Sequence, residues 1–186
     1  VTPRIDSKYV VVSQIVSIPP RQVRWARRHA EARNEFYEDE TDWNDTREGN
    51  PIEDNFVGIM GELGFAIYYD LQVDANIFEI SDGGSDFTVQ VNNEVREVDV
   101  KTRRKYPDRL WVKEHALDAD YYVLAYIDRP DDPETPVGWR VELFGGASRD
   151  KLQDATRVES DYGFWNRSIF IEDLDALPDP ESITSG

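Results

Sequence analysis

A stretch of alternating polar and apolar residues, DFTVQVNNEVREVDVKT (residues 86–102), limits the fold of this chain more than any other part of the sequence. Successive side chains of a strand point to opposite faces, and the Asn-Asn pair that interrupts the alternation suits a two-residue hairpin turn. We therefore predict an antiparallel hairpin in which Val91 faces Glu94. In that register Asp86 lies directly opposite Asp99.

The predicted register gives the hairpin two chemically different faces. The apolar face carries Phe87, Val89, Val91, Val98 and Val100. The other face carries Asp86, Thr88, Gln90, Glu97, Asp99 and Lys101. A three-residue turn, NNE, is the alternative, and it would shift the pairing by one residue and separate the two aspartates. With the two-residue turn, one face packs into a core and the other presents facing carboxylates.

Facing carboxylates indicate a cation site. Asp86 and Asp99 would lie about 5 Å apart at Cβ and repel each other, and a divalent cation would turn this repulsion into binding. The chain has no cysteine, and ligands that are all oxygen favour Mg²⁺ or Mn²⁺ over zinc. Lys101 projects from the same face and could orient a water or stabilise a phosphate oxyanion. The alternative is a solvated hairpin face with an Asp–Lys salt bridge.

A second stretch, NFVGIMGELGFAIYY (residues 55–69), predicts a buried helix because nearly every position is apolar or glycine. Asp54 is a plausible N-cap. Glu62 is the one charge inside the stretch, and a buried carboxylate needs a cation, a metal or an arginine partner. Glycine recurs at every third position, which indicates close approach of the helix backbone to another element. These positions are Gly58, Gly61 and Gly64.

The other elements predict an α/β fold with a mixed central β-sheet flanked by helices. An apolar strand is expected within residues 9–18, an Arg-rich helix over 19–37, and an acidic loop from Glu38 to Pro51. Six strand-like runs follow, NIFEI, DFTVQV, VREVDVKT, RLWV, YYVLAYI and WRVELFG, and then a short helix at SRDKLQDA and a strand and turn at FWNRSIFIEDLDALP. We expect a single domain over 1–186, with an N-terminal arm, helix and loop (1–50), a core (54–145) and a C-terminal extension (146–186).

Composition indicates a protein of a high-salt cytoplasm. Asp and Glu total 38 against 21 Lys and Arg, which gives a net charge of -17 over 186 residues. The acids are dispersed along the chain, and strong salt screening makes such self-repulsion cheap. A partner for basic proteins is the alternative. The lack of cysteine and of a recognisable signal peptide fits an intracellular location, and we expect no membrane association because no apolar run approaches about 18 residues.

Taken together and in this order, Glu62 in GELGFA, Asp86 in GGSDF and the Asp99–Lys101 pair in VDVKT resemble the PD-(D/E)XK nuclease superfamily, whose fold is restriction-endonuclease-like. The resemblance covers roughly residues 54–145, with YYVLAYI as the next core strand. Further along, GGASRDKL and NRSIFIEDLDALP are similar to parts of phage and archaeal virus members. The chain departs from the common pattern in having Ser85 before the strand aspartate.

The resemblance implies a metal-dependent endonuclease or other nuclease that hydrolyses DNA. Glu62, Asp86, Asp99 and the Val100 carbonyl would hold one or two Mg²⁺ ions, which lower the pKa of a bound water and polarise the phosphate. Lys101 would position the nucleophile or balance developing charge. Two alternatives stay open: a catalytically silent nuclease-like protein for DNA binding or assembly, and a Holliday-junction or other structure-specific endonuclease, which would be a homodimer.

Two groups of basic residues are candidate DNA contacts. One directly follows the hairpin, and the other lies on one face of the Arg-rich helix. Pairing with the abundant acids is the alternative for both. The groups are Arg103, Arg104 and Lys105, and Arg21, Arg24 and Arg28. We expect no nucleotide cofactor, because GIMGELG lacks the GK[ST] of a phosphate-binding loop, and neither histidine is supported as a ligand.

Overall fold

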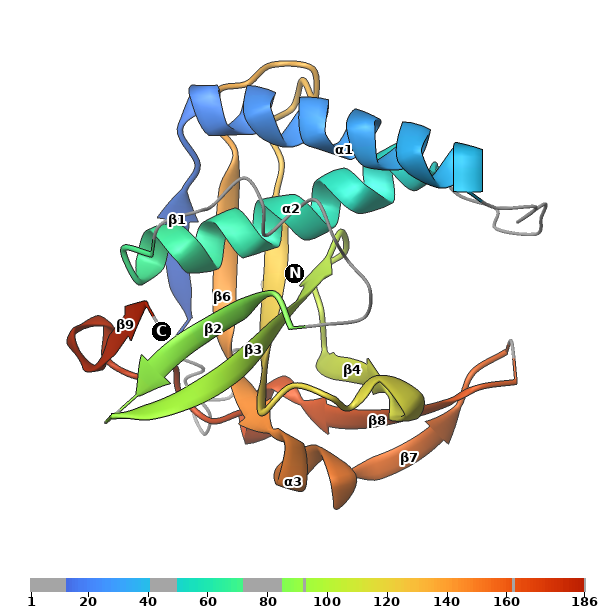
Figure 1. Cartoon of the computed structure of the whole chain (residues 1–186), viewed down its shortest axis with the longest axis vertical. Helices are drawn as coiled ribbons and strands as arrows, with labels where there is room; N and C mark the ends of the chain where they lie inside the picture. Colours follow the sequence, from blue (N-terminus) through green and yellow to red (C-terminus); the bar gives the residue numbers. More distant parts are fainter. Residues whose placement is uncertain (1–12, 41–49, 72–84, 92, 162, 186) are drawn as a thin grey trace, which may run out of the picture.

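A computed structural model of the chain describes residues 13–40, 50–71, 85–91, 93–161 and 163–185 (Figure 1). The elements along the chain are β1 (Gln14–Ser17), α1 (Pro20–Glu40), α2 (Pro51–Tyr68), β2 (Phe87–Val91), β3 (Glu94–Arg103), β4 (Arg109–Lys113), β5 (Tyr121–Asp128), β6 (Arg140–Ser148), α3 (Arg149–Gln153), β7 (Thr156–Glu159), β8 (Trp165–Phe170) and β9 (Ile183–Ser185). Short 3-10 turns cover Glu114–Ala116, Ile171–Asp173 and Pro180–Ser182.

The described strands form two sheets. The larger one is mixed and has the order β1-β6-β5-β3-β2-β9, and the smaller one has the order β4-β8-β7. Within the larger sheet β3 pairs antiparallel with β2 and parallel with β5. The predicted α/β class with a mixed sheet and helices is therefore confirmed.

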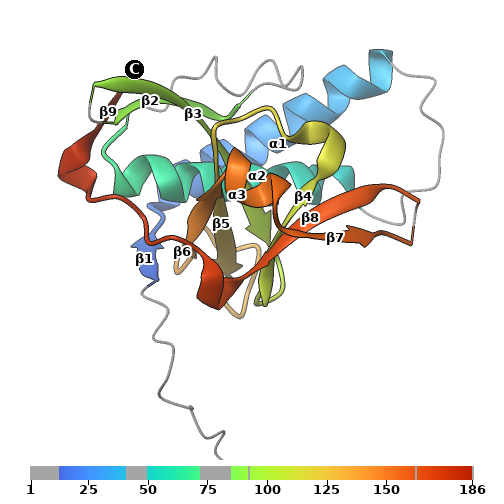
Figure 2. The same cartoon turned by 90° about the horizontal axis from the view of Figure 1, so that it is seen from below.

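Each face of the larger sheet has its own apolar core. On one face α2 packs against the sheet and α1 packs against α2, and this core includes Phe65, Val98 and Val123. On the other face β4, β8 and α3 pack against β5 and β6 through residues such as Leu110 and Leu124. In Figure 1 α1 lies at the top and the smaller sheet at the bottom, and in the view from below α1 lies behind the rest (Figure 2).

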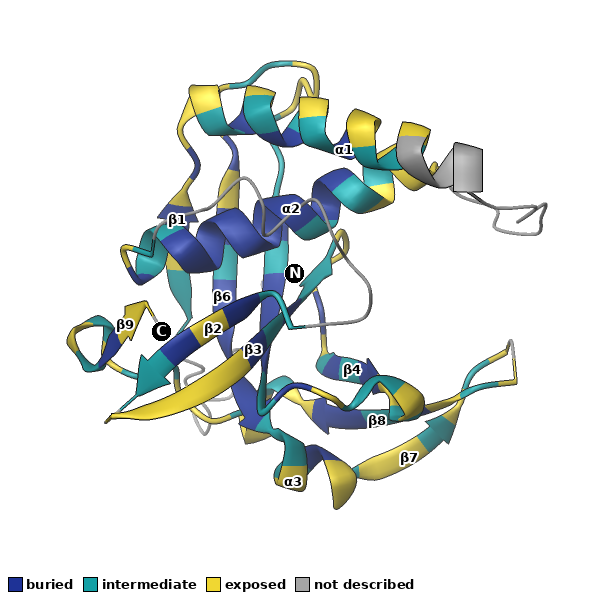
Figure 3. Cartoon of the chain, viewed as in Figure 1, coloured by how far each residue is buried: buried dark blue, intermediate teal, exposed yellow. Residues whose placement is uncertain are grey.

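Helix α2 lies between α1 and the larger sheet, which explains its composition. Every residue of α2 from Phe56 to Ala66 except Gly58 is buried, whereas α1 exposes one side (Figure 3). A helix covered on both sides needs apolar residues all round. Two of its glycines make the close approach that their spacing predicts. A Cβ at position 61 would lie 1.8 Å from Thr102 Oγ1, and one at position 64 would lie 2.6 Å from Val141 Cγ1.

The structure moves some predicted boundaries. The N-cap of α2 is Asn50 and not Asp54, because the Asn50 side chain accepts hydrogen bonds from the amides of Ile52 and Glu53 and Pro51 occupies the first turn. Helix α1 continues to Glu40, so it includes the first residues of the expected acidic loop. The rest of that loop up to residue 49, the expected strand NIFEI and residues 9–12 of the expected first strand lie outside the described residues.

Candidate active site

The hairpin has the predicted register. Val91 pairs with Glu94 and Phe87 with Val98, so a two-residue turn joins the strands. Asn93 has a φ of 66°, a left-handed conformation that asparagine tolerates and that such turns require. Asp86 directly precedes β2, and the register places it beside Asp99. The structure thus brings together the two carboxylates that the sequence predicted to face each other.

Asp86 is held firmly in this position. Its Oδ2 accepts a hydrogen bond of 2.7 Å from the backbone amide of Val100, and its carboxyl group also shares a hydrogen bond with Asp99. Burial raises the pKa of Asp86 well above its usual range, and the negative charges of Glu62 and Asp99 raise it further. A carboxyl group buried beside other negative charges favours its protonated form unless a cation offsets those charges.

Glu62 is buried on α2, and only 7% of its surface is exposed. The close contact of Gly61 with β3 brings the neighbouring carboxylate into electrostatic reach of the hairpin. Burial raises the pKa of Glu62 to about 7. The positive charge of Arg33 on α1 opposes this rise, and the negative charge of Asp99 adds to it. The positive charge of Lys101 also opposes the rise. The negative charge of Asp99 therefore raises the pKa of both Glu62 and Asp86.

Lys101 forms an ion pair with Asp99, with 2.5 Å between Nζ and Oδ2. The lysine side chain is 35% exposed and the aspartate side chain 14% exposed. The Asp–Lys salt bridge considered from the sequence is thus present, and it forms at the edge of a site with two further acids. Both side chains lie on the sheet face opposite Val98 and Val100, which are buried against α2.

The donor set of this site suits a hard divalent cation. In the part of the chain that the structure describes, no three His, Cys, Asp or Glu side chains, Glu62 included, are grouped so that they could hold a metal ion together. Asp86 and Asp99 nevertheless offer oxygen ligands at hydrogen-bonding distance from each other, and burial disfavours the negative charge of Asp86. Carboxylate oxygens are the ligands that Mg²⁺ and Mn²⁺ prefer.

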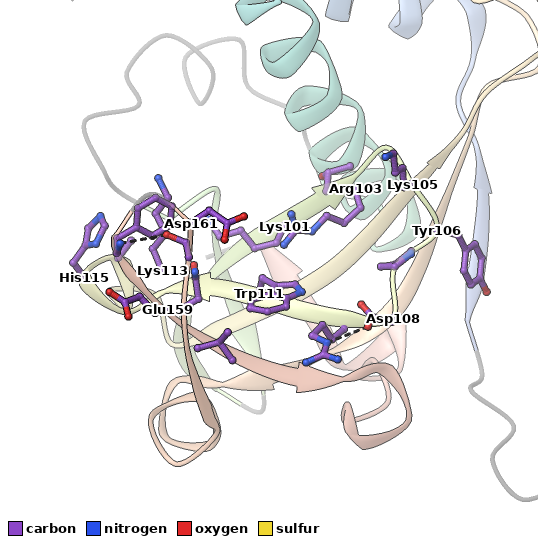
Figure 4. A pocket seen from close by; sticks show the side chains of 18 residues that line it. Lys101, Arg103, Lys105, Tyr106, Asp108, Trp111, Lys113, His115, Glu159 and Asp161 are labelled. Carbon is purple, nitrogen blue, oxygen red and sulfur yellow. Dashed lines mark hydrogen bonds and ion pairs between the residues drawn. The ribbon is translucent and has the colours of Figure 1, made fainter. Parts of the chain in front are cut away.

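A cavity of about 950 Å³ opens beside Lys101 (Figure 4). It lies between the end of β3 and the smaller sheet. Its charged lining residues are Lys101, Arg103, Lys105, Asp108, Arg109, Lys113, Glu159 and Asp161. Basic residues outnumber acidic ones here, whereas acids dominate the whole chain by 38 to 21. This local reversal makes the cavity suitable for an anion.

The basic groups predicted from the sequence fall in different places. Arg103 and Lys105 line the cavity, and burial lowers the pKa of the Arg103 guanidinium, while Asp108 opposes this. Arg104 points elsewhere and pairs with Asp54 in the first turn of α2. The three arginines of α1 that were predicted as DNA contacts are not among the cavity-lining residues, because α1 packs on the far side of α2 (Figure 1). These three are Arg21, Arg24 and Arg28, all exposed.

Sequence reasoning missed the contribution of β4 to this cavity. Arg109, Trp111 and Lys113 line it, while the intervening Leu110 and Val112 are 0% and 1% exposed. The signal was the alternation in RLWVK, which places the two aliphatic residues on one face and the other three on the opposite face.

The two histidines have different surroundings. His115 lines the cavity. The His29 ring lies 3.8 Å from that of Trp25, and its Nδ1 is 3.0 Å from the Trp25 carbonyl oxygen.

No described helix is long and apolar enough to cross a membrane. Comparisons with protein-family models, curated proteins and solved structures found no significant match.

Proposed function

We propose that the chain is a metal-dependent nuclease with a restriction-endonuclease-like core formed by α2, β2, β3 and β5. The observation that carries this proposal is the convergence of Asp86 and Asp99 beside Lys101, with Glu62 in electrostatic reach. Strand β5 lies parallel to β3 at its other edge, as the next core strand of the PD-(D/E)XK pattern. The reaction is hydrolysis of a phosphodiester bond, with DNA as the expected substrate.

In this proposal each residue has a defined task. Asp86, Asp99 and the Val100 carbonyl would hold the cation, with Glu62 as a further carboxylate. When bound, the cation supplies Lewis-acid activation of water and of the phosphodiester. The hydrogen bond from the Val100 amide fixes the orientation of Asp86, so this ligand needs little reorganisation.

Lys101 has two properties that suit a group acting on phosphate. Its ammonium borders the cavity, and its partner Asp99 limits the positions that it can occupy. An ammonium group held beside the scissile phosphate stabilises the negative charge that develops on the phosphate oxygens in the transition state. Arg103 and Lys105, further along the same wall, would contact neighbouring phosphates.

A catalytically silent nucleic-acid-binding protein is the second candidate. The Lys101–Asp99 ion pair favours it, because this pair neutralises a carboxylate that a metal would otherwise use. The two candidates share the cavity and differ only in whether bond cleavage follows binding.

The test is cleavage of plasmid, single-stranded DNA, branched DNA and RNA with Mg²⁺ or Mn²⁺ across a range of KCl concentrations. We expect wild-type cleavage that chelation abolishes, and a decrease of about 100-fold or more in Asp99→Asn and Lys101→Met. Lys151 and Asp175 form a matched ion pair of 2.6 Å elsewhere on the surface, so Lys151→Met and Asp175→Asn should cleave like the wild type. A folded wild type that cleaves none of these substrates would support the silent candidate.

A further inference from the structure

The aromatic side chain of Trp111 does not belong to the apolar core beneath the smaller sheet. Leu110 and Val112 on the same strand fill the core below it and are almost fully buried. Trp111 points the other way, into the cavity, and lies below Lys101 in Figure 4. A large aromatic ring in a cavity beside basic groups serves neither the core nor a phosphate contact.

The cavity has two ends of different charge. Arg103 and Lys105 lie with Asp108 at one end, Glu159 and Asp161 lie with Lys113 at the other, and Trp111 lies between them (Figure 4). Basic groups are therefore in excess at the first end and acidic groups at the second. A single strand of nucleic acid that enters over the basic end would have favourable phosphate contacts there. Its next base would then lie over the tryptophan ring. A duplex lying across the cavity would bring phosphates to the acidic end as well, where they would be repelled.

The chemistry of the ring also favours unpaired nucleotides. In a duplex the bases are stacked inside and the outer surface is mainly sugar and phosphate, to which an indole ring offers little. Bases of a single strand can stack on aromatic side chains, and one such contact is worth roughly 1–3 kcal/mol. Arg109, held 3.1 Å from Asp108, lies 5.2 Å from the Trp111 ring centroid, so a cation already borders the ring.

We propose that this cavity binds an unpaired segment of nucleic acid, with one base stacked on Trp111 and the preceding phosphates on Arg103 and Lys105. This inference rests on the proposed function for the choice of nucleic acid, and it adds that the substrate is single-stranded where it enters the site. Single-stranded DNA, single-stranded RNA, or a duplex with a frayed or branched end would all supply such a segment.

The test measures binding separately from cleavage. The full chain is titrated, with a chelator present, into labelled single strands of about 12 nucleotides, which lies within the site sizes of single-strand channels. A hairpin duplex of the same sequence and an unlabelled polyglutamate competitor are run in parallel. We expect the single strand to bind at least about tenfold more tightly than the duplex and polyglutamate to compete poorly, because polyglutamate has charge but no bases.

Trp111→Ala should weaken single-strand binding by roughly 5- to 150-fold, the range expected for loss of one stacked base, and Trp111→Phe should recover part of it. Trp165→Ala is the matched control, because Trp165 lies on β8 of the same sheet, stacks on Arg157 at 4.0 Å and does not line the cavity. It should bind like the wild type. Circular dichroism of each variant checks its folding.

If the wild type binds the duplex as tightly as the single strand, or if folded Trp111→Ala binds the single strand as tightly as Trp165→Ala, the inference is overturned. Its failure is distinguishable from failure of the proposed function. Tight single-strand binding without cleavage by the wild type rejects the nuclease and keeps this site. Duplex cleavage unchanged by Trp111→Ala rejects this site and keeps the nuclease.

Discussion

Gly61 of α2 lies directly against Thr102 of β3, so close that a methyl group at position 61 would lie 1.8 Å from the threonine hydroxyl oxygen. This contact sets the distance between the helix that carries Glu62 and the strand that carries Asp99 and Lys101. Gly58, one turn earlier, has room for a methyl group, because the nearest atom, a Glu62 carboxylate oxygen, would be at an ordinary contact distance of 3.9 Å from a Cβ built there.

The two glycines should therefore respond in opposite ways to alanine. Alanine in a helix interior gains about 1 kcal/mol over glycine, and Gly58→Ala should keep most of this gain. Gly61→Ala should lower the free energy of unfolding by about 1–2 kcal/mol, because overpacking costs about 1–3 kcal/mol. Urea unfolding of both variants measures the difference. Gly61→Ala combined with Thr102→Ala should recover part of the loss, and equal stability of the two single variants would contradict the close packing.

Glu62 should make the stability of the protein depend on pH. Its pKa is about 7 in the folded protein against an ordinary value of 4.5, so the folded state keeps a proton that the unfolded state has lost. The resulting stabilisation is complete below about pH 4.5 and is lost as the pH rises through 7. Asp86 acts in the same direction. Unfolding by urea between pH 5 and 8 should show a falling free energy in the wild type and a smaller fall in Glu62→Gln. An identical slope in both proteins would refute this assignment.

Divalent cations should stabilise the folded protein through Asp86. A cation that binds only the folded state at 100 times its dissociation constant adds about 2.7 kcal/mol, which raises Tm by roughly 5–10 °C in a chain of this size. Asp86→Asn keeps an oxygen that can accept from the Val100 amide, so it should be at least as stable as the wild type without cation. With Mg²⁺ or Mn²⁺ it should gain much less.

The control for this comparison is Asp175→Asn, which removes a surface carboxylate that is paired with Lys151 and should gain as much as the wild type. Mg²⁺ is compared with KCl of equal ionic strength, so that general screening is subtracted. An equal gain in Asp86→Asn and the wild type would place the bound cation elsewhere.

Potassium chloride should stabilise the fold. A net charge of -17 creates repulsion that is stronger in the compact state than in the unfolded chain, and the screening length falls from about 10 Å at 0.1 M salt to about 3 Å at 1 M. Thermal unfolding should therefore show Tm rising with KCl. Neutralising the exposed pair Asp131 and Glu134 should raise Tm at low salt more than at high salt. A Tm that is flat or falls with KCl would count against the high-salt interpretation.

The sequence predicted the hairpin well because its information is local. Alternation fixes which side chains share a face, and the Asn-Asn turn fixes the register, so the proximity of Asp86 and Asp99 followed from counting. Helix α2 was predictable for a similar reason, since glycines at 61 and 64 mark close approaches. Its start was not, because the first turn lies outside the core and only the cap at Asn50 marks it.

The cavity could not be predicted from local patterns. It lies between the end of β3 and residues of β4, β7 and β8, such as Trp111 and Asn166, which come together only through tertiary packing. Alternation continued from Lys101 separates Arg104, which turns toward Asp54, from Arg103 and Lys105, but it does not reveal the cavity that these two line. Likewise, the sequence shows that α1 has an arginine-rich face. The packing of α1 on α2 determines that this face lies away from the cavity.

The pairing of β2 with β9 has a consequence for folding during synthesis. Val89 pairs with Ser185 and Val91 with Ile183, so the strand next to Asp86 gains its second neighbour only after residues 183–185 have left the ribosome. The β2–β3 hairpin can form early, since its contacts are local, whereas this outer pairing joins distant parts of the chain and forms slowly. Until then β2 is an open edge that could pair with another nascent chain. Aggregation of this protein during expression should therefore depend on how quickly β9 pairs with β2.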